Sequence, residues 1–417
     1  MALLVQKYGG TSVGSIELIR RVAARVAAVR ERGDRIAVVV SAMGDSTDRL
    51  VDLAKEICAE PAPREMDALL STGEQVSIAL LAMALETHGV RARSFTGAQV
   101  RVRTSNIHGR ARINDVETAR LHAALDEGIV PVVAGFQGVD DAGNITTIGR
   151  GGSDTTAVAL AVALKADECQ ILTDVDGVYT TDPRVVGSAR RLDRLSFEEM
   201  LELAGQGSRV LHLRSVEFAA KYNVPLRVLA SFGSGPGTLI CKEDQRVEAP
   251  VVAGVAFNRD EEQITVTGLP SAPGTPYDVL KPVSDSNIEI DMIVVAGRAA
   301  GSTDLSFTVN REDYPQVMRL VQEATRAHSG CTVTGNDRVA KLSIVGVGMR
   351  SHAGVATRLF ETLAKAGASM HLVSTSEIKI SVLIPESELE GCVADVHRAF
   401  ELEKTPRPSH GEPLNTR

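Results

Sequence analysis

Hydrophobic and polar positions follow two different periods along the first part of the chain. Apolar side chains recur at Ile19, Val22, Val26 and Val29, and this spacing predicts an amphipathic helix over residues 16–32. The next segment, 36–40, is an uninterrupted apolar run rich in β-branched side chains, which is typical of a strand buried on both faces. The two patterns together predict that strands and helices alternate.

The same alternation continues up to about residue 172. Further helices are predicted over 50–60, 75–87, 118–126 and 157–165, and further strands over 3–5, 92–96, 129–135 and 168–172. This order predicts a doubly wound α/β domain with a mainly parallel sheet. Ligands bind beyond the carboxyl ends of the strands in such sheets. Polar loops follow three of these strands, at 7–15, at 41–48 and after 129–134.

The second half of the chain contains an internal repeat. A strand, a turn, a helix and a second strand are predicted between residues 264 and 295, and the same order returns between 341 and 374. The repeat has the length of a small βαββαβ module. Residues 235–248 are predicted to end the first domain and to form a linker, and the proline-containing tail 404–417 is predicted to be disordered.

Composition and charge narrow the possible partners. The 417 residues are 44% apolar and 24% charged, which is the balance of a globular protein with real cores. Net charge is −8 without a local Lys/Arg cluster, so neither nucleic acid nor an anionic membrane is an expected partner. Aromatic residues make up only 3%, which argues against stacking platforms for bases.

The cysteines and the start of the chain predict a cytoplasmic protein. Five widely spaced cysteines without a C-x-x-C pair are expected to be reduced thiols, because a disulfide framework or zinc site needs paired spacing. The chain begins without a basic segment and long apolar run, so no signal peptide is expected. The apolar stretch 76–85 is too short to span a membrane.

Two glycine-rich loops carry the candidate chemistry. Lys7 precedes Gly9 and Gly10 between a strand and a helix, an order that aims backbone N–H groups at an anion. Taken alone, this motif is weak, and a tight turn with a solvated lysine would be the more common interpretation. A second pair, Gly151 and Gly152, precedes the helix at 157–165, so two anion cradles suggest a long, multiply charged ligand. The loop 173–184 is either a surface hairpin turn or a nucleotide clamp.

These stretches resemble the aspartate kinases, of the bacterial monofunctional type within the amino-acid kinase superfamily. The matching segments are 7–12, 40–48, 71–75, 135–139, 146–156, 173–184 and 374–379. The resemblance implies an αβα sandwich with a mainly parallel sheet, followed by two regulatory ACT domains of βαββαβ topology. The implied boundaries are 1–245 for the catalytic domain, 263–335 for the first ACT domain and 336–403 for the second, with 250–262 completing the second.

The resemblance implies transfer of the γ-phosphoryl group of ATP, with Mg²⁺, to the side-chain carboxylate of L-aspartate. The product is an acyl phosphate, the first step towards lysine, threonine and methionine. An aspartate carboxylate titrates near pH ~4 and is already ionised at neutrality, so no general base is needed. None of the nine histidines falls within the motifs. Catalysis would consist of positioning and charge neutralisation.

Residue roles follow from the resemblance, motif by motif. The implied catalytic residues are Lys7 and Asp154. The implied substrate-binding residues are Ser41, Thr47, Glu74, Arg150, Gly151, Gly152 and Ser153. The implied ATP-binding residues are Lys7, Tyr8, Gly9, Gly10, Thr173, Asp174, Tyr179, Arg184 and Arg209. No metal-binding residue is named, because Mg²⁺ on nucleotides keeps waters and few protein ligands.

The roles of Arg150, Glu74 and Arg209 rest on separate chemical arguments. The fork of Arg150 suits the α-carboxylate of aspartate. Glu74 would take the α-ammonium, although Ser71 and Glu74 also have the spacing of a capping box. Arg209 stands where the family usually has a lysine, which keeps the charge and changes the shape.

The regulatory positions depart further from the family pattern. The implied effector-binding positions are Ser271, Val295, Ala296, Ser369, Thr375, Ser376 and Glu377. Several family amide or carboxylate side chains are replaced here by Ser271, Val295, Ala296 and Ser369, and each loss should cost on the order of 1–3 kcal/mol of effector binding. We predict weak or absent feedback inhibition by lysine and threonine; another ligand or compensating contacts is the alternative.

Two other functions compete with this interpretation. A sister amino-acid kinase acting on another carboxylate would share the glycine loops, but not the ACT pair and the Arg150 motif. A non-catalytic ACT sensor of amino acids would not need Lys7, Arg150 and Asp154. A homo-oligomer formed through the ACT domains is expected.

Overall fold

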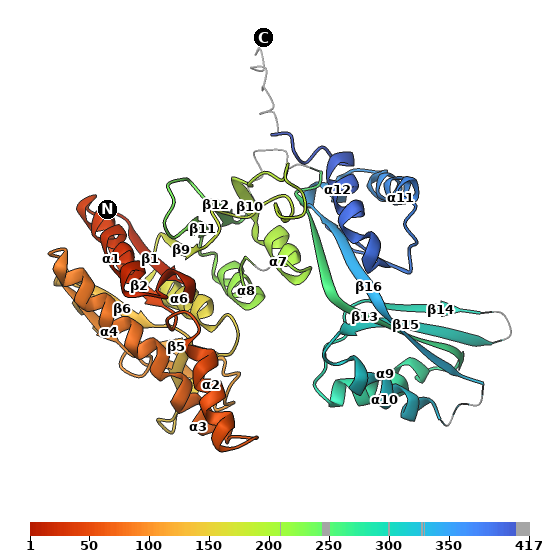
Figure 1. The fold of residues 1–417 in the computed structure, drawn as a ribbon, viewed down its shortest axis with the longest axis horizontal. Coiled ribbons are helices and arrows are strands. Elements are labelled where there is room, and N and C mark those ends of the chain that lie inside the picture. The colour runs from red at the N-terminus through yellow and green to blue at the C-terminus, as the bar shows by residue number, and fades with distance from the viewer. Residues whose placement is uncertain (209, 244–250, 299–300, 327, 329, 406–417) are drawn as a thin grey trace, which may run out of the picture. The chain divides into compact units, whose positions relative to one another are not determined.

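The structure is a computed structural model that describes residues 1–405 except 209, 244–250, 299–300, 327 and 329. The chain forms two compact units (Figure 1). Unit 1 consists of Met1–Val178, Arg191–Ala204 and Arg209–Asp244, and unit 2 consists of Tyr179–Arg190, Gly205–Ser208 and Gln245–Arg417. The predicted tail falls mostly outside the described residues.

An eight-stranded sheet of order β10-β12-β11-β9-β1-β2-β6-β3 forms the centre of unit 1. Its strands are β1 (Leu3–Tyr8), β2 (Arg35–Val40), β3 (Ala92–Phe95), β6 (Val130–Ala134), β9 (Glu168–Thr173), β10 (Arg194–Ser196), β11 (Leu226–Ala230) and β12 (Thr238–Cys241). Every neighbouring pair is parallel except β11 with β12. The predicted mainly parallel sheet is therefore confirmed.

Helices cover both faces of this sheet, which explains the continuous apolar strands. Helices α1 (Ile16–Glu31) and α4 (Thr72–Thr87) pack on one face through side chains such as Ile19 and Leu81. Helix α6 (Gly152–Leu164) lies against β1 and β9, outside that core, and nearly all of its residues are buried. Such all-round burial matches its apolar sequence.

The rest of unit 1 surrounds these layers. Its further elements are η1 (Gly10–Ser12), α2 (Ser46–Ile57), α3 (Pro63–Leu70), α5 (Ala119–Asp126), α7 (Phe197–Gly205) and α8 (Leu213–Tyr222). A second sheet of order β5-β4-β7-β8 was not predicted from the sequence. Its strands are β4 (Val102–Thr104), β5 (Ile113–Val116), β7 (Gln137–Val139) and β8 (Ile145–Thr147), each only three or four residues long.

Unit 2 contains an antiparallel six-stranded sheet of order β14-β15-β13-β16-β18-β17. Its strands are β13 (Gly254–Pro270), β14 (Ile293–Gly297), β15 (Ser302–Asn310), β16 (Thr332–Val345), β17 (Leu372–Thr375) and β18 (Lys379–Pro385). Its helices are α9 (Thr275–Asp285), α10 (Tyr314–Thr325), η2 (Val347–Ser351), α11 (Val355–Lys365), η3 (Glu386–Glu388) and α12 (Leu389–Ala399).

The two long strands of this sheet serve both repeats. The first repeat runs β13-α9-β14-β15-α10-β16, and the second runs β16-α11-β17-β18-α12. The start of β13 adds the missing strand to the second repeat, because Gly254 pairs with Val345 and Phe257 with Leu342. Each repeat thus has a βαββαβ arrangement, with its own apolar core beneath its helices.

Two short segments from the first half of the chain pack into unit 2. The carbonyl of Thr180 accepts a hydrogen bond from the Val255 N–H (2.7 Å), and Val186 belongs to the core of the second repeat. The Ser343 hydroxyl donates to the Gln206 side-chain oxygen (3.1 Å). A Cβ on Gly207 would lie 2.2 Å from the Phe257 carbonyl oxygen. The compact units therefore do not divide at a single point near residue 245.

Among the described residues, one stretch is long and apolar enough to cross a membrane, Pro63–Thr87. It comprises α3 and α4, which are separated by a turn at Ser71. This is weak evidence for a membrane span, because Leu81 and Leu85 of α4 are fully buried in the core of unit 1.

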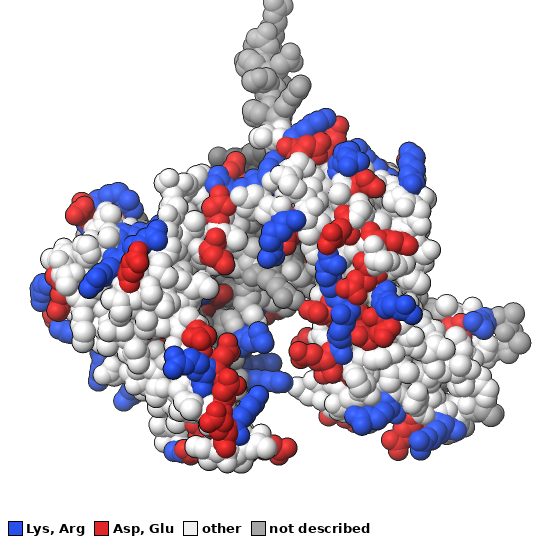
Figure 2. Space-filling model, viewed as in Figure 1, with Lys and Arg blue, Asp and Glu red and all other residues white. Residues whose placement is uncertain are grey.

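Basic and acidic side chains are interspersed over the face shown in Figure 2. Many charged side chains of the described residues form ion pairs, such as Arg35 with Asp126 and Arg259 with Glu390, both at 2.6 Å. Exposed pairs of this kind contribute little to stability. They do show that much of the charge is locally balanced.

Candidate active site

The carboxyl ends of four neighbouring strands meet at one edge of the large sheet. Backbone hydrogen bonds tie their loops together. Gly9 donates to the Leu172 carbonyl (3.3 Å), Ser41 to the Tyr8 carbonyl (3.1 Å) and Gly135 to the Val40 carbonyl (3.0 Å). The loops after β1, β2, β6 and β9 are therefore adjacent, and the first three of them are the polar loops that the sequence places at the strand ends.

An ion pair between Lys7 and Asp154 lies at this edge. The Lys7 Nζ and Asp154 Oδ1 atoms are 2.6 Å apart, and both side chains are mostly buried. Lys7 points to the face of the sheet covered by α6, and Asp154 lies in the first turn of that helix. The lysine ammonium is thus held beside a helix N-terminus, where the backbone N–H groups also favour an anion.

The two glycines after β1 leave space for different neighbours. A Cβ on Gly10 would lie 2.9 Å from the Ala42 carbonyl oxygen, so glycine allows the first two loops to approach closely. A Cβ on Gly9 would meet only the Lys7 ammonium, at 3.6 Å. That Cβ would occupy the space beside the ammonium, which Gly9 leaves open.

Glu74 is a buried carboxylate at the start of α4. Its Oε1 accepts a hydrogen bond from the Ala42 N–H (3.0 Å), whereas Oε2 is buried without a hydrogen-bond partner in the described part of the chain. Burial raises the pKa of Glu74 to about 7, and the Ala42 hydrogen bond opposes that rise only partly. A cationic group of a ligand could therefore donate to Oε2 the hydrogen bond that this oxygen lacks in the described part of the chain.

The alternative of a capping box at this position is wrong. The Ser71 side chain makes no capping hydrogen bond to α4. Its hydroxyl donates instead to the Ala68 carbonyl at the end of α3 (2.8 Å). A helix precedes Ser71 immediately, so the residue has helical backbone angles rather than the extended ones of a typical N-cap.

The Arg150 turn lies between β8 and α6. Gly149 and Gly151 flank the arginine with φ of +85° and +67°, a left-handed backbone that favours glycine. The Gly152 N–H donates to the Gly149 carbonyl (2.9 Å) and closes the turn. Arg150 is exposed, and the described residues give it no ion pair. Its guanidinium is available to a ligand.

The remaining predicted substrate residues lie around this edge. Ser41 follows β2, and Thr47 lies in the first turn of α2; both are half-buried. Ser153 is buried in the first turn of α6, and a Cβ on Gly135 would lie 2.6 Å from its hydroxyl oxygen. This contact brings the loop after β6 against the helix N-terminus.

The predicted nucleotide residues are distributed over both units. Thr173 is the last residue of β9 in unit 1 and Asp174 follows it; the Thr173 hydroxyl donates to the Asp174 carboxylate (3.1 Å). Tyr179 and Arg184 lie in the segment that belongs to unit 2, and Arg184 pairs with Asp182 at 2.7 Å. Arg209 falls outside the described residues.

A nucleotide contact from the Tyr8 side chain is contradicted by the structure. Its ring is fully buried on the side of the sheet covered by α1 and α4, and its hydroxyl donates to Gln6 (2.9 Å). The alternation of side chains along β1 places Lys7 and Tyr8 on opposite faces. Only the backbone of Tyr8 reaches the loop.

His212, the residue before α8, was not predicted from the sequence as a site residue. A Cβ on Gly151 would lie 2.1 Å from the His212 Cγ, so the imidazole packs directly on the Arg150 turn. Its Nδ1 is buried and has no hydrogen-bond partner among the described residues. Burial holds its pKa below the usual range, with Arg214 and Arg150 acting in the same direction and Asp154 opposing them. The feature of the sequence that could have pointed to His212 is its position just after the segment that contains Arg209.

Asp67 was also missed. Its buried carboxylate contacts the His108 Nδ1 (2.6 Å) and accepts hydrogen bonds from the Gly109 N–H (3.0 Å) and the Thr147 hydroxyl (2.5 Å). These bonds tie α3 to β8 and to the loop at Gly109. A Cβ on Gly149 would lie 3.0 Å from the Gly109 carbonyl oxygen, so this network supports the Arg150 turn from a second side.

The predicted effector positions lie at the edges of the sheet in unit 2. Val295 and Ala296 belong to β14, Thr375 ends β17, and Ser376 and Glu377 follow it. Ser271 and Ser369 lie in exposed loops that precede α9 and β17. A small apolar cluster includes Val294 of β14 and Leu372 of β17, so these two edge strands approach one another.

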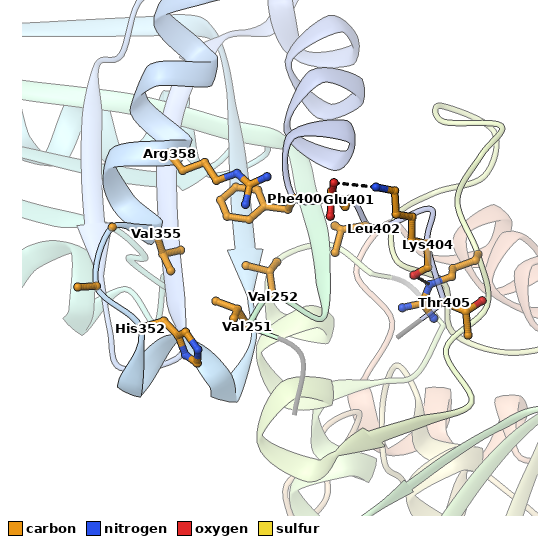
Figure 3. Close-up of a pocket in the computed structure, with 13 residues that line it drawn as sticks. Val251, Val252, His352, Val355, Arg358, Phe400, Glu401, Leu402, Lys404 and Thr405 are labelled. Atoms are coloured by element: carbon orange, nitrogen blue, oxygen red, sulfur yellow. Dashed lines mark hydrogen bonds and ion pairs between the residues drawn. The ribbon is translucent and has the colours of Figure 1, made fainter. Parts of the chain in front are cut away.

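A surface cavity of about 920 Å³ lies elsewhere in unit 2. Figure 3 shows Arg358 and Phe400 on one side of it and Lys404, paired with Glu401, on the other. None of the predicted site residues is among the described residues that line it. The candidate active site is therefore the strand edge of unit 1, not this cavity.

Comparison with known proteins identifies the family. The amino acid kinase family model matches residues 2–230, and an ACT domain model matches residues 342–400. Aspartate kinase of Pseudomonas putida is 57% identical over 408 residues, which cover 98% of this chain and 99% of that protein. The chain belongs to the aspartate kinases. Aspartokinase of Mycobacterium tuberculosis is 48% identical over 407 residues, 96% of this chain and 97% of that protein.

Solved aspartate kinase structures share the fold. Escherichia coli aspartokinase III in complex with aspartate and ADP has a TM-score of 0.79 at 27% identity, covering 95% of this chain and 99% of that chain. The same enzyme in complex with lysine and aspartate has a TM-score of 0.76. Membership of the aspartate kinases confirms the predicted family, fold class and kinase activity.

Proposed function

We propose that the chain transfers the γ-phosphoryl group of ATP to the side-chain carboxylate of L-aspartate, giving 4-phospho-L-aspartate and ADP. The Lys7–Asp154 ion pair at the N-terminus of α6 is the observation that carries this proposal. It places a fixed ammonium and aligned backbone N–H groups at the strand edge where α/β sheets bind ligands. Escherichia coli aspartokinase III, solved in complex with aspartate and ADP, supports the choice of substrates.

Lys7 acts on the transferring phosphoryl group. In an in-line transfer, charge spreads over the phosphoryl oxygens, and a fixed ammonium stabilises that charge without reorganising. Asp154 orients the lysine through their ion pair. The N–H groups of Gly9, Gly10 and the first turn of α6 supply further hydrogen bonds. The attacking carboxylate of aspartate is already ionised, so no side chain needs to remove a proton.

Arg150 and Glu74 recognise the two ends of the amino acid. The exposed guanidinium of Arg150 binds the α-carboxylate with two parallel hydrogen bonds. The unpartnered Oε2 of Glu74 accepts a hydrogen bond from the α-ammonium, and this cation lowers the pKa that burial has raised. Ser41, Thr47 and Ser153 complete the substrate site as hydrogen-bond donors.

Mg²⁺ accompanies the nucleotide in this proposal. The described residues hold no group of three or more His, Cys, Asp or Glu side chains that could bind a metal ion. In the proposal the ion is carried by phosphate oxygens and water, and it would neutralise phosphate charge during transfer. Thr173 and Asp174 are proposed to contact the nucleotide, and Tyr179, Arg184 and Arg209 stay predictions from the sequence.

Unit 2 is proposed to regulate the kinase and to form a homo-oligomer through its ACT modules. Of the effector positions, Val295, Ala296 and Thr375 lie on β14 and β17, the edge strands of the six-stranded sheet. Because Val295 and Ala296 lack the side-chain polar groups that would hold an amino acid, inhibition by lysine and threonine is expected to be weak or absent. The five cysteines are free, which suits a cytoplasmic enzyme.

Trapping of the acyl phosphate tests the function. The purified chain is incubated with ATP, Mg²⁺ and L-aspartate in hydroxylamine, and the hydroxamate and ADP are measured. Equal amounts of both products that depend on aspartate are expected. ADP release that ignores aspartate, or hydroxamate formed from glutamate in its place, would contradict the proposal.

A further inference from the structure

The α8 N-terminus holds His212 in a fixed position. The His212 carbonyl accepts hydrogen bonds from the Ser215 N–H (3.0 Å) and the Ser215 hydroxyl (2.6 Å). Helix α8 starts at the next residue, Leu213. The backbone that carries the imidazole is therefore anchored to the first turn of the helix.

The same helix end contacts the Arg150 turn twice. The His212 ring lies where a side chain on Gly151 would be, with Cγ and Cβ only 2.1 Å and 2.3 Å from a Cβ placed there. Arg214 donates to the Ile148 carbonyl (2.9 Å) and to the Ala111 carbonyl (3.2 Å). Contacts therefore reach the turn on both sides of Arg150.

The charges around His212 come from three elements. Asp154 of α6, Arg150 of the turn, and Arg214 and Glu217 of α8 interact electrostatically with the ring. Burial keeps the pKa of His212 below its usual range, so the ring is neutral near pH 7. A neutral ring supports the turn without adding a cation that would compete with Arg150 for an anionic ligand.

We infer that His212 is a positioning residue for aspartate: its ring holds the left-handed backbone of Gly151 and so aims Arg150 at the α-carboxylate. This inference rests on the proposed function, in which Arg150 binds that carboxylate. Among the proposed nucleotide contacts, Lys7, Gly9, Gly10, Thr173 and Asp174 lie on β1, β9 and the loops that follow them, so most of ATP binding does not depend on His212. Loss of the ring should therefore affect one substrate and not the other.

Steady-state kinetics of ring variants test the inference. His212→Ala is expected to raise KM for aspartate at least about tenfold, because a small misplacement of a binding group is enough for such an effect. KM for ATP should change by less than about twofold. His212→Phe, which keeps a flat ring in place, should restore most of the aspartate affinity. His88→Ala, an exposed histidine at the end of α4, serves as the control.

A paired substitution tests the contact itself. Gly151→Ala should raise KM for aspartate, because its Cβ meets the imidazole. Adding His212→Gly should recover part of that loss, since it removes the three His212 atoms that the new Cβ would meet. If the change of KM for aspartate in the double variant equals the product of the changes in the two single variants, the contact is not the cause and the inference is overturned.

Failure of the inference and failure of the proposed function are distinguishable. Aspartate-dependent turnover by the wild type, with equal changes of both KM values in folded His212→Ala and His212→Phe, overturns the inference alone. Thermal unfolding of each variant shows whether it is folded. Absence of aspartate-dependent turnover in the wild type overturns the proposed function and the inference together.

Discussion

Replacement of Glu74 by glutamine should stabilise the protein and remove aspartate recognition at once. The pKa of Glu74 rises from its ordinary value of 4.5 to about 7 in the folded chain. The folded state therefore prefers the neutral acid, and ionisation destabilises it. The penalty is absent below pH 4.5, grows between pH 4.5 and 7 and is constant above pH 7. At about 1.4 kcal/mol per pH unit it amounts to about 3 kcal/mol.

Glu74→Gln keeps the carbonyl oxygen that accepts from Ala42 and cannot ionise. We expect its unfolding temperature to match that of the wild type near pH 4.5. At pH 8 it should be higher by roughly 6–12 °C, using 2–4 °C per kcal/mol for a unit of this size. Glu86→Gln, an exposed substitution on the same helix, should change neither value. A difference between Glu74→Gln and wild type that stays flat from pH 4.5 to 8 would refute the reasoning.

The same substitution should weaken the recognition of aspartate, although it stabilises the folded chain. Only ionised Glu74 attracts the aspartate ammonium, so kcat/KM for aspartate in the wild type should fall about tenfold per pH unit below about pH 7. Glu74→Gln should lose this acidic limb and show a low, pH-independent affinity for aspartate. An unchanged acidic limb in the variant would assign that limb to another group.

The remaining predictions concern other parts of the molecule. Lys7→Ala should lower kcat by about 10²–10³ in the hydroxamate assay while the chain stays folded, because one fixed charge at the phosphoryl group is lost; a loss below tenfold would contradict its role. Arg150→Lys keeps the charge but not the fork, so KM for aspartate should rise by about tenfold or more at constant KM for ATP. Lys341→Met should lower the free energy of unfolding by roughly 3–5 kcal/mol in denaturant titrations, because it leaves Glu261, its buried ion-pair partner in unit 2, unpaired. Lysine plus threonine at submillimolar concentration should leave turnover unchanged, and marked inhibition would show that the effector sites work despite Val295 and Ala296.

Much of the fold follows from patterns that one segment carries by itself. Helix α1 and strand β2 were predicted within one residue of their observed ends, since the period and the β-branched run are local signals. The position of the loops at one sheet edge followed from parallel order. The three- and four-residue strands of the second sheet were missed, because such short segments show no period.

The parts of the site that were missed depend on contacts between distant segments. His212 is fixed by a glycine about sixty residues earlier in the chain, and Asp67 by a loop and a strand beyond it. Tyr8 was assigned by its place in a motif, whereas the alternation of β1 turns its ring into the core. Spacing along the sequence does not show which face of a strand meets which helix.

The packing of residues 179–190 and 205–208 with unit 2 has a consequence for evolution. The regulatory part of this chain is not a cassette that recombination could exchange at a single junction near residue 245. A regulatory part grafted from a relative would bring a sheet whose surface evolved to pack on that relative's own segments. Thr180, Val186 and Gln206 would then meet unmatched neighbours. Catalytic and regulatory sequences are therefore expected to diverge together, and chimeras should succeed only when these two short segments travel with the ACT modules.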